Sequence, residues 1–146
     1  MNLIDTNAVG YIFHQGIQIQ DVYHMAPEVA EEVEMTELVH GKSTPEKIRK
    51  IDGTQFFKEG YYIDFFSSML NKHSGKSFFN MTGFGDISIL ATIHTTIKVF
   101  DLEKSERLFD PTETIFVFTS DNGLIKRISR EFEGADVEVR GLSQLV

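Results

Sequence analysis

Two aspartates follow short apolar runs of the sequence. Asp5 comes directly after residues 2–4, and Asp121 comes shortly after residues 114–119, which form the most strand-like segment of the chain. In an open parallel sheet, ligands bind outside the carboxyl ends of the strands. The two carboxylates would therefore share one crevice if both runs are strands of such a sheet.

Two further acidic residues fall on the inward faces of predicted helices. Asp86 begins a helix predicted over residues 86–99 and lies on its inward face, in the first turn. Glu32 lies at the margin of the inward face of a helix that begins near Pro27. The inward positions are Ile89, Leu90, Ile93 and Ile97 in the first helix, and Val29, Val33 and Thr36 in the second.

Four carboxylates that face inward or lie at a sheet edge are costly to bury unless cations neutralise them. Hard oxygen ligands of this kind select Mg²⁺ or Mn²⁺. Each residue also has a simpler explanation, because Asp commonly caps a helix after a strand and most helix glutamates are solvated. Capping is the favoured interpretation for any single Asp, so the predicted metal site depends on all four acids occurring together.

The elements around these acids follow from short apolar runs that alternate with helical periodicity, a pattern that predicts an α/β fold. Predicted strands cover residues 3–4, 21–25, 114–119 and 136–140. Predicted helices cover residues 7–14, a segment from Pro27, a segment capped by Ser43 or Thr44 that includes Ile48 and Ile51, residues 61–72 and 86–99, and a segment that includes Leu124, Ile125 and Ile128. Residues 71–76 are predicted to form a polar loop.

The length of 146 residues suits a single domain over residues 1–146. The absence of cysteine excludes disulfides, thiolate metal sites and a cysteine nucleophile, and the histidines share no spacing typical of a zinc site. A net charge of −8 argues against a protein that coats nucleic acid through a basic surface, but it is compatible with a nuclease that uses cations. Because there is neither a signal peptide nor an apolar run of roughly 20 residues, we expect a cytoplasmic protein without a membrane partner.

The four acidic segments resemble, in order, the motifs of the PIN-domain nuclease family. Residues 3–7 (LIDTN) are similar to the opening motif, an apolar strand closed by Asp with a polar residue and Asn behind it. Residues 27–33 (PEVAEEV) look like the second motif, in which a helix places one acidic residue inward. Residues 85–91 (GDISILA) resemble the third motif, and residues 119–124 (TSDNGL) resemble the fourth.

This resemblance implies a three-layer α/β/α fold with a central parallel twisted sheet of four or five strands. It also implies a Mg²⁺- or Mn²⁺-dependent endoribonuclease with one or two ions. The implied ligands are Asp5, Glu32, Asp86 and Asp121, with Asn7 and either Thr119 or Ser120 supporting them. Glu28 or Glu31 would replace Glu32 if the helix register is shifted. Family members often carry a second acid after the third-motif Asp, but residues 88–93 contain none.

RNA contacts are expected from basic residues near the pocket, although a solvated surface charge is the favoured interpretation for any single one. The candidates are Lys42, Lys72, Lys76, Lys126, Arg127 and Arg130. Many stand-alone PIN domains of this length resemble toxins of toxin–antitoxin pairs, which implies a homodimer and a small antitoxin protein that covers the pocket. A housekeeping or phage-encoded nuclease is equally compatible with the sequence.

Three other classes compete with the nuclease. A haloacid-dehalogenase-like phosphatase also begins with a strand that ends in Asp, but it needs a second Asp two residues later, where this chain has Asn7. A response-regulator receiver domain needs paired acids near the first strand and a late Lys, and neither pattern is evident. A degenerate PIN-like domain that binds or scaffolds without catalysis is disfavoured because all four acidic positions are retained.

Overall fold

The computed structural model describes residues 1–51, 56, 59–73, 84–106 and 113–146, leaving aside the side chains of His73 and residues 100–106. Its centre is a five-stranded sheet in the order β3-β2-β1-β4-β5, and every neighbouring pair of strands is parallel. The strands are β1 (Asn2–Ile4), β2 (Tyr23–Met25), β3 (Ile48–Lys50), β4 (Ile115–Phe118) and β5 (Val137–Arg140). The helices are α1 (Thr6–Gln15), α2 (Pro27–His40), α4 (Tyr61–His73), α5 (Gly85–Glu106), α6 (Asn122–Glu131) and the short 3₁₀ helix η1 (Leu142–Gln144).

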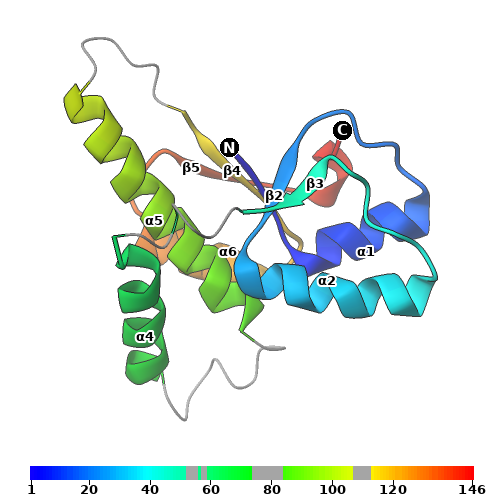
Figure 1. The fold of residues 1–146 in the computed structure, drawn as a ribbon, viewed down its shortest axis with the longest axis horizontal. Helices are drawn as coiled ribbons and strands as arrows, with labels where there is room; N and C mark the ends of the chain where they lie inside the picture. Colours follow the sequence, from blue (N-terminus) through cyan, green and yellow to red (C-terminus); the bar gives the residue numbers. More distant parts are fainter. Residues whose placement is uncertain (52–55, 57–58, 74–83, 107–112) are drawn as a thin grey trace.

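Helices cover both faces of the sheet (Figure 1). α1 and α2 lie on one side of it, and α4, α5 and α6 lie on the other. The predicted three-layer α/β/α architecture with a parallel central sheet is therefore confirmed, and the sheet has five strands. Within the described part of the chain, no helix has both the length and the apolar character that a bilayer crossing requires.

β1 lies in the middle of the sheet, and the connections run from the centre in opposite directions. α1 leads from β1 to β2 on one side, whereas α6 leads from β4 to β5 on the other. The carboxyl ends of β1 and β4 therefore flank the point where the strand order reverses, which is where open α/β sheets bind ligands. Asp5 stays joined to β4 beyond the end of β1, because its N–H donates to the carbonyl of Phe118 at 3.1 Å.

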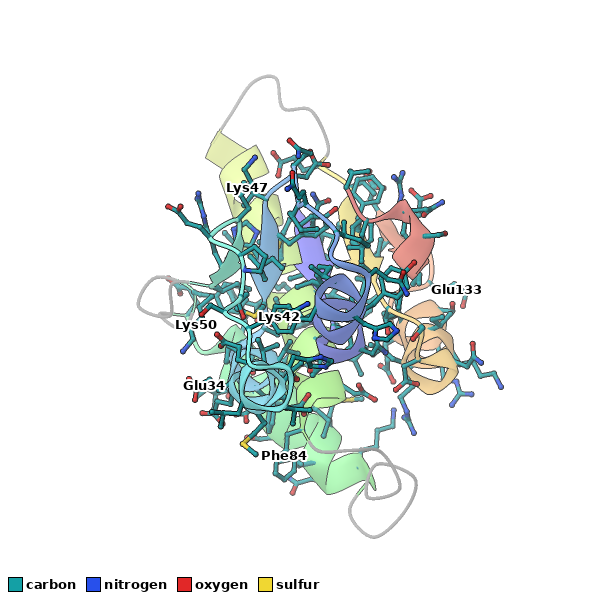
Figure 2. The ribbon with its side chains drawn as sticks, turned by 90° about the vertical axis from the view of Figure 1, so that its right-hand side faces the viewer. Glu34, Lys42, Lys47, Lys50, Phe84 and Glu133 are labelled. Carbon is teal, nitrogen blue, oxygen red and sulfur yellow. The ribbon has the colours of Figure 1, made fainter. Side chains whose placement is uncertain are left out.

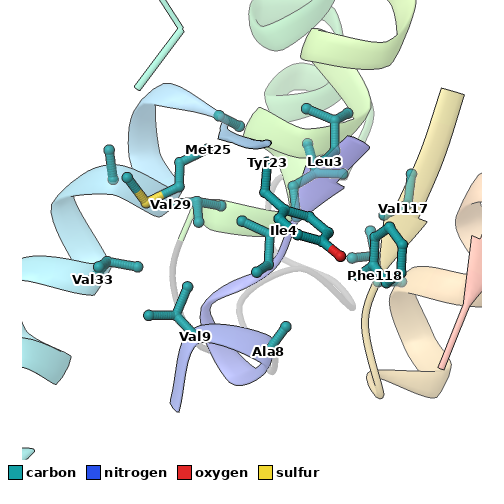
Figure 3. Close-up of a cluster of buried hydrophobic side chains, with 14 of the residues drawn as sticks. Leu3, Ile4, Ala8, Val9, Tyr23, Met25, Val29, Val33, Val117 and Phe118 are labelled. Carbon is teal, nitrogen blue, oxygen red and sulfur yellow. The ribbon is translucent and has the colours of Figure 1, made fainter. Parts of the chain in front are cut away.

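The core between the sheet and the first two helices is formed by apolar side chains from both layers (Figure 3). Ile4 of β1 and Tyr23 of β2 meet Val9 of α1 and Val29 of α2, and all four are buried. The Tyr23 ring packs edge-on against the ring of Phe118, with 5.1 Å between the centroids. This packing fixes the first turns of α1 and α2 relative to the carboxyl edge of the sheet.

One predicted helix is wrong. The segment that Ser43 or Thr44 was expected to cap forms β3 instead, with Ile48 in register with Tyr23 of β2. Ile48 and Ile51 lie three residues apart, as on a helix face, and this spacing suggested the helix. The edge of β2 decides the conformation, because the N–H of Tyr23 donates to the carbonyl just before β3 at 2.9 Å. Such tertiary pairing overrides local pattern.

The other predicted elements are confirmed, with shifted ends. α4 continues to His73, so the prediction of a polar loop over residues 71–76 is wrong for residues 71–73, and residues 74–76 lie outside the described residues. α5 extends to Glu106, well beyond its predicted end at Val99. Helix ends are the least determined part of a periodic pattern, because fraying and capping rather than core spacing decide them.

Candidate functional site

Asp5 ends the central strand and caps α1. One carboxylate oxygen accepts from the Thr6 N–H at 2.7 Å, and the other accepts from the Thr119 hydroxyl at 2.7 Å. The side chain is buried, with 6% of the residue exposed. Burial raises the pKa of Asp5, the charges of Asp121 and Glu32 add to this rise, and the two hydrogen bonds oppose it. Asp5 is therefore an acid held close to other acids at the carboxyl end of β1.

Asp121 plays the corresponding part after β4. Its Oδ1 accepts from the N–H groups of Gly123 and Leu124 at 2.8 and 3.1 Å, which caps α6. The hydroxyl of Thr119 accepts from the Asp121 N–H at 3.0 Å while it donates to Asp5. Thr119 thus joins the two aspartates that follow β1 and β4.

Asn7 and Ser120 extend this hydrogen-bond network. The Asn7 side-chain amide donates to the Thr119 hydroxyl at 3.5 Å, and its Oδ1 accepts from the Ser120 N–H at 3.4 Å. Asn7 and Thr119 therefore contribute side chains, whereas Ser120 contributes a backbone group and is otherwise exposed. The three predicted supporting residues lie together and add hydrogen bonds between α1 and the end of β4.

Glu32 reaches the same place from α2. Its Oε2 accepts from the Thr6 hydroxyl at 2.5 Å. A Cβ atom on Gly85 would lie 2.8 Å from both carboxylate oxygens of Glu32. Only glycine leaves room for this carboxylate in its present position, so the first residue of α5 is part of the site. Thr6 and Gly85 therefore hold Glu32 between the starts of α1 and α5.

The other two glutamates considered as ligands lie elsewhere on α2. Glu31 is exposed. Burial, together with the charges of Glu28 and Glu31, raises the pKa of Tyr62 to about 12, so these two carboxylates lie towards α4. The carboxylate that meets Thr6 and Gly85 is thus that of Glu32, whereas Glu28 contacts the start of α5 through its backbone N–H, which donates to the Ser88 hydroxyl at 3.2 Å.

Asp86 lies in the first turn of α5. Its Oδ2 is buried and finds no hydrogen-bond partner among the residues that the structure describes. Burial raises the pKa of Asp86 to about 7, and the charges of Asp5, Asp121 and Glu32 contribute to the rise, while Arg127 opposes it. The four predicted acids are therefore close enough to act on one another.

The donor set suits a hard divalent cation in kind, because it consists of carboxylate oxygens and includes one buried oxygen without a partner. A complete coordination sphere is not assembled: in the described ranges, no group of three or more acidic or histidine side chains is arranged to hold an ion. Asp5, Glu32 and Asp121 point instead at hydroxyl and amide donors. The site is a cluster of interacting acids, whose carboxylates would have to turn towards a common point to hold an ion.

The predicted RNA contacts fall into different regions. Arg127 is half-buried on α6, and its charge acts on Asp86, whereas Lys126 and Arg130 are exposed on the same helix. Lys42 donates to the Phe13 carbonyl at 2.6 Å, at the far end of α1, about 12 Å along the helix axis from Asp5. Lys42, which Figure 2 labels, therefore contacts the end of α1 opposite to the one that Asp5 caps.

The remaining two basic candidates provide less. The Nζ of Lys72 lies 3.9 Å from a carboxylate oxygen of Glu131 and joins α4 to α6. Lys76 lies outside the described residues. Among the basic candidates that the structure describes, Arg127 is the one whose charge opposes the rise in the pKa of Asp86.

Two residues of the site were missed at the sequence level. Thr6 orients both Asp5 and Glu32, and Gly85 makes space for Glu32. Thr6 directly follows Asp5 and Gly85 directly precedes Asp86, so both lie within the acidic segments. If the acids are expected to converge, a hydroxyl residue beside one acid predicts a hydrogen-bond donor to a second acid. A glycine beside another predicts close approach of a neighbouring side chain.

No protein-family model, curated protein or solved structure matches this chain.

Proposed function

We propose that this chain is a Mg²⁺- or Mn²⁺-dependent endoribonuclease that hydrolyses RNA phosphodiester bonds at Asp5, Glu32, Asp86 and Asp121. The observation that carries the proposal is the buried oxygen of Asp86, which lacks a hydrogen-bond donor in the described part of the chain although three other acids act on it. Burying such a group costs folding free energy. A bound cation would offset that cost by neutralising the carboxylates.

The position of the cluster supports the same conclusion. It lies at the carboxyl ends of the two strands that flank the reversal of strand order, where this class of sheet binds its ligands. Helix capping accounts for Asp5 and Asp121, since both accept from backbone N–H groups. Capping does not account for Glu32 or Asp86, and these two come from different helices on opposite sides of the sheet.

In the proposed reaction, the oxygen of a water molecule bonds to phosphorus, the P–O3′ bond breaks, and the 3′ oxygen leaves with a proton. When bound, a divalent ion supplies Lewis-acid polarisation of the phosphoryl group. Thr119 and Thr6 keep Asp5 and Glu32 oriented. Asp86, whose pKa is raised to about 7, must release its proton to serve as a ligand. Arg127 supplies positive charge beside the cluster for a substrate phosphate.

The cellular setting belongs to the proposal only through the resemblance to PIN domains. It comprises a cytoplasmic location, a homodimer and, if the chain is a toxin, a small antitoxin protein that covers the pocket. The closest test of that setting is whether a short open reading frame lies immediately upstream of the gene and whether its product copurifies with this chain.

The direct test of the reaction is incubation of total RNA with the protein and Mn²⁺, followed by mapping of the cut ends. We expect cleavage that leaves 5′-phosphates, stops with chelator, and is lost in both Asp5→Ala and the milder Asp5→Asn variant. Asp21→Ala, at an exposed aspartate remote from the cluster, serves as the matched control. Chelator-insensitive cleavage, or full activity in Asp5→Asn, would contradict the proposal.

A second candidate is a PIN-like binding domain without catalysis. Its support is that Asp5, Glu32 and Asp121 already serve hydrogen bonds and that no ligand group of three is arranged among the described residues. A domain of this kind would bind no Mn²⁺ tightly and would leave RNA intact under every condition above.

A further inference from the structure

We propose that Phe84 forms a base-stacking subsite next to the acidic cluster, an inference that rests on the proposed ribonuclease function and adds a binding residue to it. Phe84 is 48% exposed and stands immediately before Gly85 and Asp86. Two residues of chain span at most about 7 Å. The Cα atoms of Phe84 and Asp86, the residue with the buried oxygen, are therefore no further apart than about the length of one nucleotide.

The backbone of Phe84 is held in place by the start of α5. Its carbonyl accepts from the Ser88 N–H at 2.9 Å, which is the first hydrogen bond of this helix. The next residue, Gly85, is buried against the Glu32 carboxylate. The aromatic ring is therefore anchored to the same turn that presents Asp86.

The ring itself has an aromatic support. Phe84 packs on Phe66 of α4 with 6.2 Å between the ring centroids, and Phe66 stacks on Tyr62 at 5.8 Å. Tyr62 is buried, and its hydroxyl lies 2.7 Å from that of Ser88 on α5. The three rings of Tyr62, Phe66 and Phe84 link α4 to the start of α5, and the Phe84 ring lies at the surface. Figure 2 shows Phe84 below the end of α2.

Phe84 also differs in kind from the other large apolar residues at the surface. Within the described ranges it is the one aromatic side chain among them, and the rest are Val22, Met35, Leu38, Val39, Ile63 and Val146. Aromatic faces stack nucleobases and tolerate any sequence, because every base has a π-face. The one exposed aromatic side chain of this group thus belongs to the residue two positions before Asp86.

The charge of the protein gives stacking a particular value here. With a net charge of −8, the chain cannot rely on a broad basic groove to hold a polyanion. Stacking adds affinity without added charge. A base on Phe84 would be unpaired, since a paired base presents its faces to its neighbours in the helix.

The test measures RNA binding, separately from cleavage. Fluorescence anisotropy follows a short fluorescein-labelled oligouridylate in Mn²⁺, with Asp5→Asn as the parent so that the probe stays intact. We expect Phe84→Ala and Phe84→Leu to weaken binding about tenfold, within the range known for single stacked bases. Phe84→Trp should bind at least as tightly as the parent. Leu38→Ala, at a more exposed apolar position on α2, should leave the affinity unchanged.

Phe84→Leu keeps an apolar side chain that can pack on Phe66, but it removes the aromatic face. It should therefore weaken RNA binding if Phe84 stacks on a base, and leave binding unchanged if Phe84 has only a structural role. Unchanged affinity in Phe84→Leu, or a Phe84→Trp protein that binds no better than Phe84→Ala, overturns the subsite. If the wild type cleaves RNA while the Phe84 variants bind normally, the subsite alone fails. If neither the wild type nor the parent acts on or binds RNA, the proposed function fails and the subsite with it.

Discussion

The helix starts that follow β1 and β4 differ from the start of α5 in what their aspartates do. Asp5 and Asp121 accept hydrogen bonds from backbone N–H groups, and Thr119 joins them to each other. Asp86 also stands in the first turn of a helix, but one of its oxygens is buried without a donor from any residue that the structure describes. Asp5 and Asp121 therefore have hydrogen-bond donors that the buried oxygen of Asp86 lacks among the described residues.

This difference separates structural from functional placement. Capping by Asp stabilises a helix by about 1 kcal/mol, so Asp121 would be favourable even in a protein without a ligand. Asp5 also caps a helix, but burial and the charges of Asp121 and Glu32 oppose that gain and raise its pKa. A buried carboxylate among other acids is unfavourable, as the raised pKa of Asp86 shows. Asp86, whose buried oxygen has no hydrogen-bond donor among the described residues, is therefore the acid for which a bound cation would be most favourable.

The largest effect that would sharpen the comparison is expected from Asp86→Asn. RNA cleavage should fall by at least about 100-fold, because a ligand matters at least as much as the outer partners whose loss costs about 10- to 100-fold. Thermal unfolding without metal should show equal or greater stability, since the substitution removes a buried charge. Asp64→Asn, at an exposed acid in the first turn of α4, is the control. Full cleavage by Asp86→Asn would contradict a functional role for the Asp86 carboxylate.

The next largest effect is expected from Gly85→Ala. The added Cβ would lie 2.8 Å from both oxygens of Glu32 and must displace that carboxylate. Because small misplacements of catalytic groups can cost up to about 100-fold in rate, we expect a loss of about tenfold in cleavage. Stability should change by less than about 1 kcal/mol, since a flexible side chain can move.

Gly10→Ala is the matched control for that experiment. Gly10 lies within α1, and its Cβ would meet the Thr36 methyl group at 4.0 Å, an ordinary contact. The control should keep full activity. If Gly85→Ala cleaves RNA as fast as Gly10→Ala does, Glu32 does not need its present position.

A smaller effect is expected from Asp121→Ala on stability. Two backbone N–H groups at the start of α6 would lose their acceptor, which should cost about 1 kcal/mol of unfolding free energy. Denaturant unfolding of the metal-free protein measures this loss beside Asp86→Asn. Equal stability changes in the two variants would mean that capping does not distinguish these aspartates.

A further prediction concerns the pH dependence of stability. The pKa of Asp86 is about 7 in the folded protein against 3.8 as the reference value, so the folded state binds the proton more tightly than the unfolded state. The resulting stability is present below about pH 4 and is lost as the pH rises to about 7. Metal-free wild type should therefore lose stability relative to Asp86→Asn across this window. A difference that is constant with pH would contradict the burial argument.

The fold was largely predictable, because its information lies in local patterns. The buried strand before Asp5, the apolar run before Asp121 and the inward face of α5 are each visible in short stretches of sequence. β3 was not predictable in this way, since the open edge of β2 rather than local spacing makes residues 48–50 extended.

The candidate site was predictable in its acids but not in their surroundings. The positions of the four acids at strand ends and on helix faces were visible in the sequence. The hydrogen bond from the Thr6 hydroxyl, which holds the Glu32 carboxylate at the start of α1, was not. Lys42 shows the limit of composition, because only tertiary structure reveals that it binds the far end of α1. The roles of Thr6 and Gly85 depend on contacts between separate helices, which no local pattern contains.

Calorimetric titration of the metal-free protein with Mn²⁺ tests the central claim most directly. The four acids predict that the wild type binds Mn²⁺, that binding releases protons near neutral pH as Asp86 ionises, and that Asp86→Asn binds at least about tenfold more weakly. A wild type that shows no Mn²⁺ binding, or an Asp86→Asn variant that binds Mn²⁺ as tightly as the wild type does, would contradict the account.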